Sequence, residues 1–195
     1  MKLVRYGAKG KELPGIIDSD GNLRSLAGLV NEGSEQFLSD KGLAELSRMN
    51  LSKLPLVPGK PRFGCPVTNI SKFVAIGLNY TDHAKETNSP IPKEPIIFMK
   101  TLNCLQGPND DVMIPRGSVK TDWEVELGIV IGKKTRYVTQ DDALDHVAGY
   151  VLVNDVSERE YQMERGPQWD KGKGCDTFGP VGPYLVTRDE VPDPQ

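Results

Sequence analysis

The stretch DWEVELGIVIG (residues 122–132) sets acidic side chains into a run that is otherwise apolar. Asp122, Glu124 and Glu126 occupy every second position, and apolar residues stand between them. Successive residues of a β-strand point to opposite faces, so the two glutamates point the same way. One interpretation is an antiparallel strand with one solvated face. The other is a cation site, because partly buried carboxylates need a compensating positive charge.

A second apolar run, GYVLVND (residues 149–155), ends in a further acid, Asp155. A carboxylate at the end of a strand is well placed to complete a site that begins on a neighbouring strand. Oxygen ligands without a nearby cysteine or histidine favour Mg²⁺, Mn²⁺ or Ca²⁺ over Zn²⁺.

The segment IGLNYTDHAKE (residues 76–86) contains a candidate base. His83 and Glu86 are three positions apart, so they share a face if the segment is a short helix. A carboxylate beside an imidazole is a common general-base arrangement. The alternative is a surface histidine with an ordinary helical neighbour. The other histidine, His146, precedes an apolar run and is interpreted as a helix-terminal or packing residue.

Apolar density falls in NDVSEREYQMERGPQWDKGKGCDTFGP (residues 154–180), and glycines and charges increase. We predict a loop, and loops beside strand ends often contain functional residues. Arg159, Gln162 and Lys173 are candidates to bind a substrate carboxylate or enolate. The alternative is a solvated loop with flexible basic groups.

The remaining pattern predicts a mixed, mainly β chain in two parts. Residues 2–7 and 13–19 are expected to form short strands, and the helical period of residues 34–49 predicts a helix. The predicted buried stripe of that helix consists of Phe37, Leu38, Leu43, Leu46 and Met49. The proline-rich residues 54–66 predict a linker or edge segment. We therefore expect a small domain over residues 1–60 and a larger one over residues 61–195. The expected strands of the second part are KFVAIGLNY, PIIFMK, DVMIP, WEVELGIVIG, VAGYVLVND and GPYLVT.

Composition narrows the class of protein. A net charge of −3 gives no indication of a basic face for nucleic acid. No apolar run approaches the roughly 18 residues of a membrane helix, and the N-terminus lacks the apolar core of a signal peptide. The three cysteines are widely spaced and form no CxxC pair, which favours a reducing, cytoplasmic compartment.

Taken together in this order, IGLNYTDHAKE, DWEVELGIVIGKK, GYVLVNDVSERE and QWDKGKGCDTFGPVGPYLVT closely resemble motifs of the fumarylacetoacetate hydrolase family. PIIFMKTLNCLQGPNDDVMIP also matches the family's pattern of an apolar strand, a lysine and a Gly-Pro turn. The resemblance runs from about residue 70 to the end. Residues before it resemble the small N-terminal domain of bacterial members.

The resemblance implies a fold and a dimer. We expect a mainly β fumarylacetoacetate hydrolase-like β-roll with a small N-terminal α+β domain, generally dimeric. Family members normally continue beyond VTRDEVPDPQ, so the chain is expected to lack the C-terminal part of the roll. A sheet that ended there would leave open edges.

The resemblance also implies roles for individual residues. Glu124, Glu126 and Asp155 match metal carboxylates, which would hold Mg²⁺ first and Mn²⁺ or Ca²⁺ as alternatives. His83 and Glu86 match a catalytic pair, and Lys173 matches a group that stabilises charge on the reacting oxygen. The expected substrate contacts are Tyr80, Arg159 and Gln162.

The activity that the resemblance implies is metal-dependent hydrolysis of a C–C bond through an enolate. The substrate would be a small oxo acid such as a 2,4-diketo acid or an acylpyruvate. Ureidoglycolate lyase, the label often given to the bacterial subgroup, stays open, as do 2,4-diketo-3-deoxy sugar-acid hydrolase and oxaloacetate decarboxylase or isomerase. Two interpretations from other classes are a non-catalytic small-molecule binding protein and a purely structural β-domain.

Overall fold

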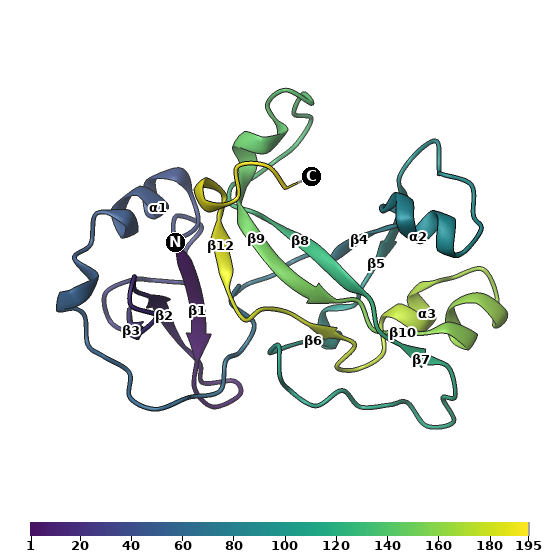
Figure 1. Cartoon of the computed structure of the whole chain (residues 1–195), viewed down its shortest axis with the longest axis horizontal. Coiled ribbons are helices and arrows are strands. Elements are labelled where there is room, and N and C mark those ends of the chain that lie inside the picture. Colours follow the sequence, from purple (N-terminus) through teal and green to yellow (C-terminus); the bar gives the residue numbers. More distant parts are fainter. Residues whose placement is uncertain (195) are drawn as a thin grey trace.

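The computed structural model describes residues 1–194, and an antiparallel sheet runs through it (Figure 1). Its six strands lie in the order β3-β2-β1-β12-β9-β8. The sheet therefore joins the first three strands of the chain to β12, β9 and β8. It crosses the expected domain boundary at residue 60. That division into two domains stays a prediction. The strands are β1 (Lys2–Tyr6), β2 (Leu13–Ile17), β3 (Leu23–Ser25), β8 (Val125–Ile131), β9 (Val147–Asn154) and β12 (Leu185–Thr187).

The N-terminal part is a three-stranded meander with one helix, α1 (Asp40–Ser47). This helix is shorter than the predicted 34–49, because Ser39 caps it by accepting a hydrogen bond from the Gly42 amide at 3.3 Å. The chain before the cap folds back over the first turn, and a Cβ on Gly42 would lie 2.1 Å from the Gln36 carbonyl. Of the predicted stripe, Leu46 is buried in the main core cluster, and the other four residues are partly buried and pack against it, although only Leu43 and Leu46 lie within α1.

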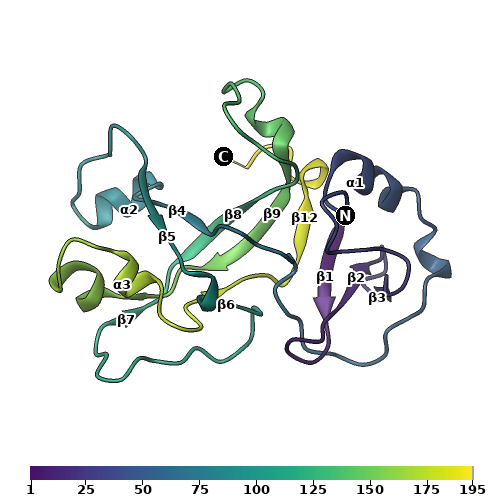
Figure 2. The same ribbon diagram turned by 180° about the vertical axis from the view of Figure 1, so that it is seen from behind.

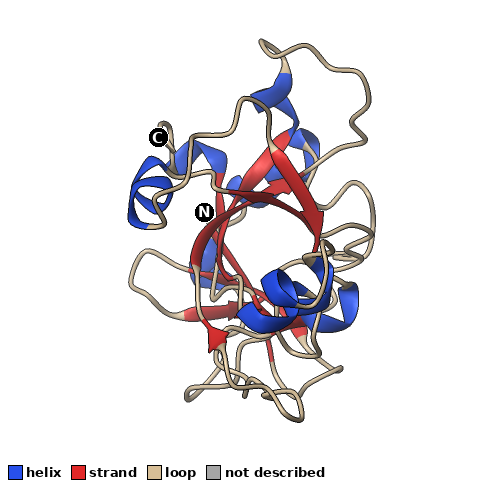
Figure 3. Cartoon of the chain, turned by 90° about the vertical axis from the view of Figure 1, so that its right-hand side faces the viewer, coloured by secondary structure: helices blue, strands red, loops and turns tan. Residues whose placement is uncertain are grey.

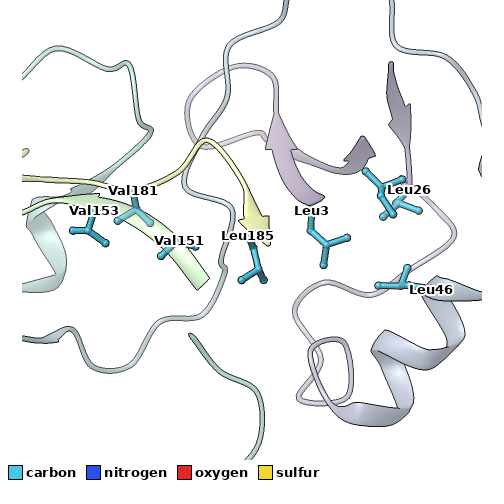
Figure 4. Close-up of a cluster of buried hydrophobic side chains, with 8 residues drawn as sticks. Leu3, Leu26, Leu46, Val151, Val153, Val181 and Leu185 are labelled. Atoms are coloured by element: carbon cyan, nitrogen blue, oxygen red, sulfur yellow. The ribbon is translucent and has the colours of Figure 1, made fainter. Parts of the chain in front are cut away.

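That core lies where the meander, α1 and the central strands meet (Figure 4). Its fully buried side chains include Leu3, Leu26 and Leu185, and Val151 and Val153 extend it along β9. The proline-rich segment 54–66 adds two isolated bridges, Leu56 to Arg24 and Phe63 to Tyr6. It therefore serves as an edge segment that covers the meander.

The other end of the molecule contains three small two-stranded sheets and short helices (Figure 2). Residues 111–115, predicted as a strand, form none, because the Met113 amide donates to the Thr177 hydroxyl at 2.7 Å instead of to a ladder. The strands here are β4 (Val74–Gly77), β5 (Ile96–Met99), β6 (Leu105–Gln106), β7 (Thr121–Asp122), β10 (Ser157–Glu158) and β11 (Gly179–Pro180).

Short helices connect these strands. The predicted loop between β10 and β11 contains two of them, a π-helical turn and α3, so that prediction was wrong for these residues. The helices are η1 (Leu51–Lys53), α2 (Thr81–Glu86), η2 (Leu102–Cys104), η3 (Ala143–His146), the π-helical turn η4 (Glu160–Glu164), α3 (Asp170–Lys173) and η5 (Arg188–Glu190). His146 ends η3, as expected of a helix-terminal residue. None of the helices described over residues 1–194 has the length and apolar character needed to cross a membrane.

Candidate active site

Strands β8 and β9 bring the acidic motifs to the end of the sheet where α3 lies (Figure 1). Seen from that end, helices stand in front of the strands (Figure 3). The two strands pair in antiparallel register, with Val125 opposite Asn154 and Glu126 opposite Val153. The Asp155 amide donates to the Glu124 carbonyl at 2.9 Å, which extends the ladder by one step. The end of β9 is thereby fixed beside the start of β8, which is where both motifs place their acids.

Lys173 lies at the centre of this cluster. Its ammonium donates to Glu124 Oε2 at 2.6 Å and to Asp155 Oδ2 at 2.9 Å, and its side chain is 2% exposed. The same ammonium lies 5.1 Å from the centre of the Phe98 ring. A buried ammonium is stable only when it is paired. The two carboxylates thus hold Lys173 in place, and Lys173 holds them together.

Arg159 covers the outer side of Glu124. Its Nη2 atom donates to Glu124 Oε1 at 2.6 Å and to Asp122 Oδ2 at 2.7 Å, while Nη1 donates to Gln162 Oε1 at 3.0 Å. Burial raises the pKa of Glu124, but the charges of Lys173 and Arg159 outweigh it and bring the pKa below its usual range. Glu124 is therefore an anion paired on both oxygens.

Glu126 differs from the other two acids, since no ion pair to it occurs among the described residues. Burial and the negative charges of Glu124 and Asp155 raise the pKa of Glu126 above its usual range. A hydrogen bond with the Tyr80 hydroxyl partly offsets this rise. The same hydroxyl accepts from the Leu127 amide at 3.2 Å, so Tyr80 reaches the open edge of β8. Three acids therefore converge here, and one of them lacks a cationic partner.

Lys100 is a site residue that we did not select from the sequence. It directly follows β5, is 1% exposed, and donates to Asp155 Oδ1 at 2.6 Å. A signal was present: Phe98 and Lys100 occupy alternate positions of one run, and both are buried. A lysine in phase with the buried face of a strand needs an anion inside the protein.

Glycines explain how α3 presents Lys173. A Cβ on Gly172 would lie 2.3 Å from the Glu158 carbonyl, and one on Gly174 would lie 2.8 Å from Thr101 Oγ1. The backbone on both sides of Lys173 thus packs directly against β10 and the end of β5. Only glycine allows so close an approach, which gives the GKG sequence a structural reason.

The structure does not bring His83 and Glu86 into this cluster. Both lie on α2, where His83 is half-buried and Glu86 is exposed. Among residues 1–194, no hydrogen bond or ion pair joins either side chain to the three acids. The helix α2 nevertheless stands at the same end of the molecule as α3 (Figures 1 and 2). A cleft of about 220 Å³ separates its first turn and Tyr80 from residues 91–95.

The donor set suits a hard divalent cation in its chemistry, because carboxylate oxygens are the preferred ligands of Mg²⁺, Mn²⁺ and Ca²⁺. The orphaned charge of Glu126 is consistent with such an ion. Across residues 1–194, however, no three acidic, histidine or cysteine side chains surround one point closely enough to hold a metal. The Lys173 ammonium occupies the space between Glu124 and Asp155.

Comparison with known proteins identifies the family. Residues 72–195 match the family model described as fumarylacetoacetate hydrolase C-terminal, and members of this family generally use divalent metals. A Burkholderia lata protein, named provisionally as a hydrolase, is 60% identical over 195 residues. The match covers 100% of this chain and 69% of that protein.

Solved structures of related proteins resemble this chain at lower sequence identity. A fumarylacetoacetate hydrolase from Exiguobacterium antarcticum has a TM-score of 0.75 at 30% identity, covering 97% of this chain and 67% of that one. A 2-hydroxyhepta-2,4-diene-1,7-dioate isomerase from Mycobacterium marinum has a TM-score of 0.70 at 30% identity, covering 96% and 66%. The motifs, the sheet and these comparisons agree, and the chain belongs to the fumarylacetoacetate hydrolase family.

Proposed function

We propose that this protein is a metal-dependent hydrolase that cleaves a C–C bond in a 2,4-diketo acid or an acylpyruvate-type substrate. The observation that carries the proposal is that Glu124 and Asp155 pair with the buried ammonium of Lys173, while Glu126 lies near enough for both acids to raise its pKa. A structural β-domain has no need for acids that repel one another in a half-buried position. Their cost is understandable if they bind a ligand.

The three acids would hold the divalent cation, with Mg²⁺ as the first candidate. Such an ion supplies polarisation of the substrate carbonyls and stabilises negative charge on an enolate leaving group. Arg159 and Gln162 lie side by side next to Glu124, joined by a 3.0 Å hydrogen bond. We assign them to the substrate carboxylate, because a guanidinium binds a carboxylate through two parallel N–H groups.

Lys173 would act on the reacting oxygen. Its ammonium contacts two carboxylates and the face of the Phe98 ring. It would donate a hydrogen bond to the substrate oxygen on which negative charge develops. Water adds to the distal carbonyl carbon, and the C–C bond then breaks. The products are a carboxylic acid and an enolate, and protonation of the enolate carbon gives the ketone.

We assign His83, oriented by Glu86, as the base that accepts the proton of the attacking water. This role requires α2 to approach the cluster, because among the described residues no hydrogen bond or ion pair joins His83 to the acids. General-base catalysis contributes roughly 10²–10⁴-fold to a rate. The non-catalytic binding protein is the less favoured alternative, because the candidate base and the acids are both present.

A substrate panel tests the proposal. Acylpyruvates, 2,4-diketo sugar acids, oxaloacetate and ureidoglycolate are each assayed with Mg²⁺ and with EDTA. We expect diketo-acid cleavage that EDTA abolishes and that added Mg²⁺ restores. Full activity after EDTA treatment and dialysis would refute the metal requirement, and turnover of ureidoglycolate alone would assign a lyase instead.

An isomerase is the second candidate, and two observations favour it. Isomerases occur among the similar structures, and His83 lies outside the cluster. Isomerisation through an enolate needs a proton moved between carbon atoms and no attacking water. Incubation in H₂¹⁸O separates the two reactions, because only hydrolysis places ¹⁸O in the acid product.

A further inference from the structure

The second buried lysine of the site, Lys100, has no part in the chemistry proposed above. Its side chain is 1% exposed, and it directly follows β5 in the interior. Removing an ammonium from water costs several kcal/mol unless its hydrogen bonds are replaced. A lysine in this position therefore needs an explanation beyond packing.

Every N–H of Lys100 has an acceptor. The ammonium donates to Asp155 Oδ1 at 2.6 Å, to the Lys173 carbonyl at 2.6 Å and to the Val156 carbonyl at 3.2 Å. A lysine has three donors, so this group is fully satisfied. Its partners are the Asp155 carboxylate, the backbone carbonyl of the residue after Asp155, and the backbone carbonyl of Lys173.

The two oxygens of Asp155 are thereby assigned to different lysines. Oδ1 accepts from Lys100, and Oδ2 accepts from Lys173 at 2.9 Å. Rotation of the carboxylate would break both contacts. Lys100 consequently fixes the plane of the Asp155 carboxylate, with one oxygen directed to the cluster.

The same segment also fixes α3. The Met99 amide donates to Asp170 Oδ1 at 3.2 Å, and the Thr101 hydroxyl donates to the Gly174 carbonyl at 2.8 Å. Three consecutive residues of the chain, 99 to 101, thus hold the helix that presents Lys173. Of the three, Lys100 alone also contacts an acid of the site.

We infer that Lys100 is a positioning residue that orients Asp155 Oδ2 and Lys173 toward the cation and substrate. The two buried lysines differ in their partners, since Lys100 donates to one carboxylate and two backbone carbonyls whereas Lys173 donates to two carboxylates. This inference rests on the proposed function, because it assumes that Asp155 binds a cation.

The test compares Lys100→Met, Thr101→Val and Lys133→Met with the wild-type chain. Methionine keeps the bulk of Lys100 without its charge. Thr101→Val loosens α3 without touching Asp155. Lys133→Met removes the charge of a lysine that pairs with Asp40 at the surface, just past the end of β8 that lies away from the acids. Calorimetric titration with Mg²⁺ or Mn²⁺ gives the affinity, and thermal unfolding gives the stability.

We expect cation affinity to fall by about 10- to 100-fold in Lys100→Met, as for other residues that orient metal ligands. Lys133→Met should bind with wild-type affinity, and Thr101→Val should lose less affinity than Lys100→Met, because it removes no contact to Asp155. Affinity in folded Lys100→Met equal to wild type, with only a lower melting temperature, would overturn the inference and leave the proposed function intact. A wild-type chain that binds no divalent cation would instead overturn the proposed function and this inference with it.

Lys100→Arg covers the case in which Lys100→Met does not fold. Arginine keeps the charge, but its planar donors cannot meet the same three acceptors. We expect weaker cation binding by this variant as well. Wild-type affinity in Lys100→Arg would show that charge alone suffices and would overturn the positioning role.

Discussion

At the scale of single residues, Glu126 links stability to function. Burial and two neighbouring acids raise its pKa, so the ionised form is disfavoured in the folded state. The folded chain binds more protons than the unfolded chain between the unfolded and the folded pKa of this group. Stability of the wild-type chain therefore decreases as pH rises through that interval.

We predict that Glu126→Gln is more stable than wild type at pH 7 and binds Mg²⁺ much more weakly. The gain in melting temperature, measured in EDTA, should shrink as pH falls through the raised pKa and vanish below the usual glutamate range. Glu45→Gln, at an exposed position on α1, is the matched control and should change neither property. Equal melting temperatures at pH 7 would contradict the electrostatic account of Glu126.

His83 is tested at the same scale. His83→Ala should lower kcat for diketo-acid hydrolysis by about 10²- to 10⁴-fold and leave cation affinity unchanged. Decarboxylation of oxaloacetate, which needs no attacking water, should be retained. The measurement is a pair of steady-state assays together with a metal titration. Hydrolysis at the wild-type rate across pH 6–9 would reject His83 as the base.

At the scale of elements, the placement of α3 depends on Gly172. A side chain there would meet the Glu158 carbonyl at 2.3 Å and the Gln162 amide nitrogen at 2.7 Å, and both are backbone atoms. Gly172→Ala must move α3 away from β10 and take Lys173 from its acids. We expect a loss of about 1–3 kcal/mol in the free energy of unfolding and a loss of activity.

Chemical denaturation and the diketo-acid assay measure the two effects. Gly33→Ala is the control, since a side chain there would meet only the tips of Asn69 and Asn31, at 3.3 and 3.5 Å. Full activity in Gly172→Ala would show that α3 does not depend on the close approach to β10.

The sequence predicted the acidic cluster because strand alternation is a local rule. Glu124, Glu126 and Asp155 follow from two apolar runs and their ends. Arg159 and Gln162, predicted to contact substrate, lie beside Glu124 on a segment that is partly helical, and their substrate role stays a prediction. Lys100 was missed although it alternates with Phe98 in one run, because its partner Asp155 is 55 positions away and the run does not identify that anion. The failure of residues 111–115 to form a strand has the same cause, since Thr177 takes the amide of Met113.

At the scale of the whole molecule, β8 is an edge strand with an apolar outer row. Val125, Leu127, Ile129 and Ile131 are exposed by 38–68% and share one face. A long apolar edge promotes association between chains. The homodimer expected from the family resemblance stays a prediction, as does the continuation of the roll past residue 195.

We predict that residues 1–195 self-associate as concentration rises and bind a hydrophobic dye. Light scattering after size exclusion measures the first effect, and dye fluorescence measures the second. Ile129→Lys should reduce both without lowering the melting temperature, because the side chain is 56% exposed. A single monomeric species that binds no dye would contradict this prediction.

The position of β12 between β1 and β9 also constrains how the chain folds. The meander β1–β3 and the hairpin β8–β9 are each built from neighbours along the chain, whereas β12 pairs with both of them. Met1 and Thr187, which share a hydrogen bond, are separated by 186 positions. Strand pairs between such distant residues form late in folding, because the chain loses a large loop-closure entropy before the contacts of the pair stabilise it. A ribosome must therefore release nearly the whole of this segment before its first strand acquires a second neighbour.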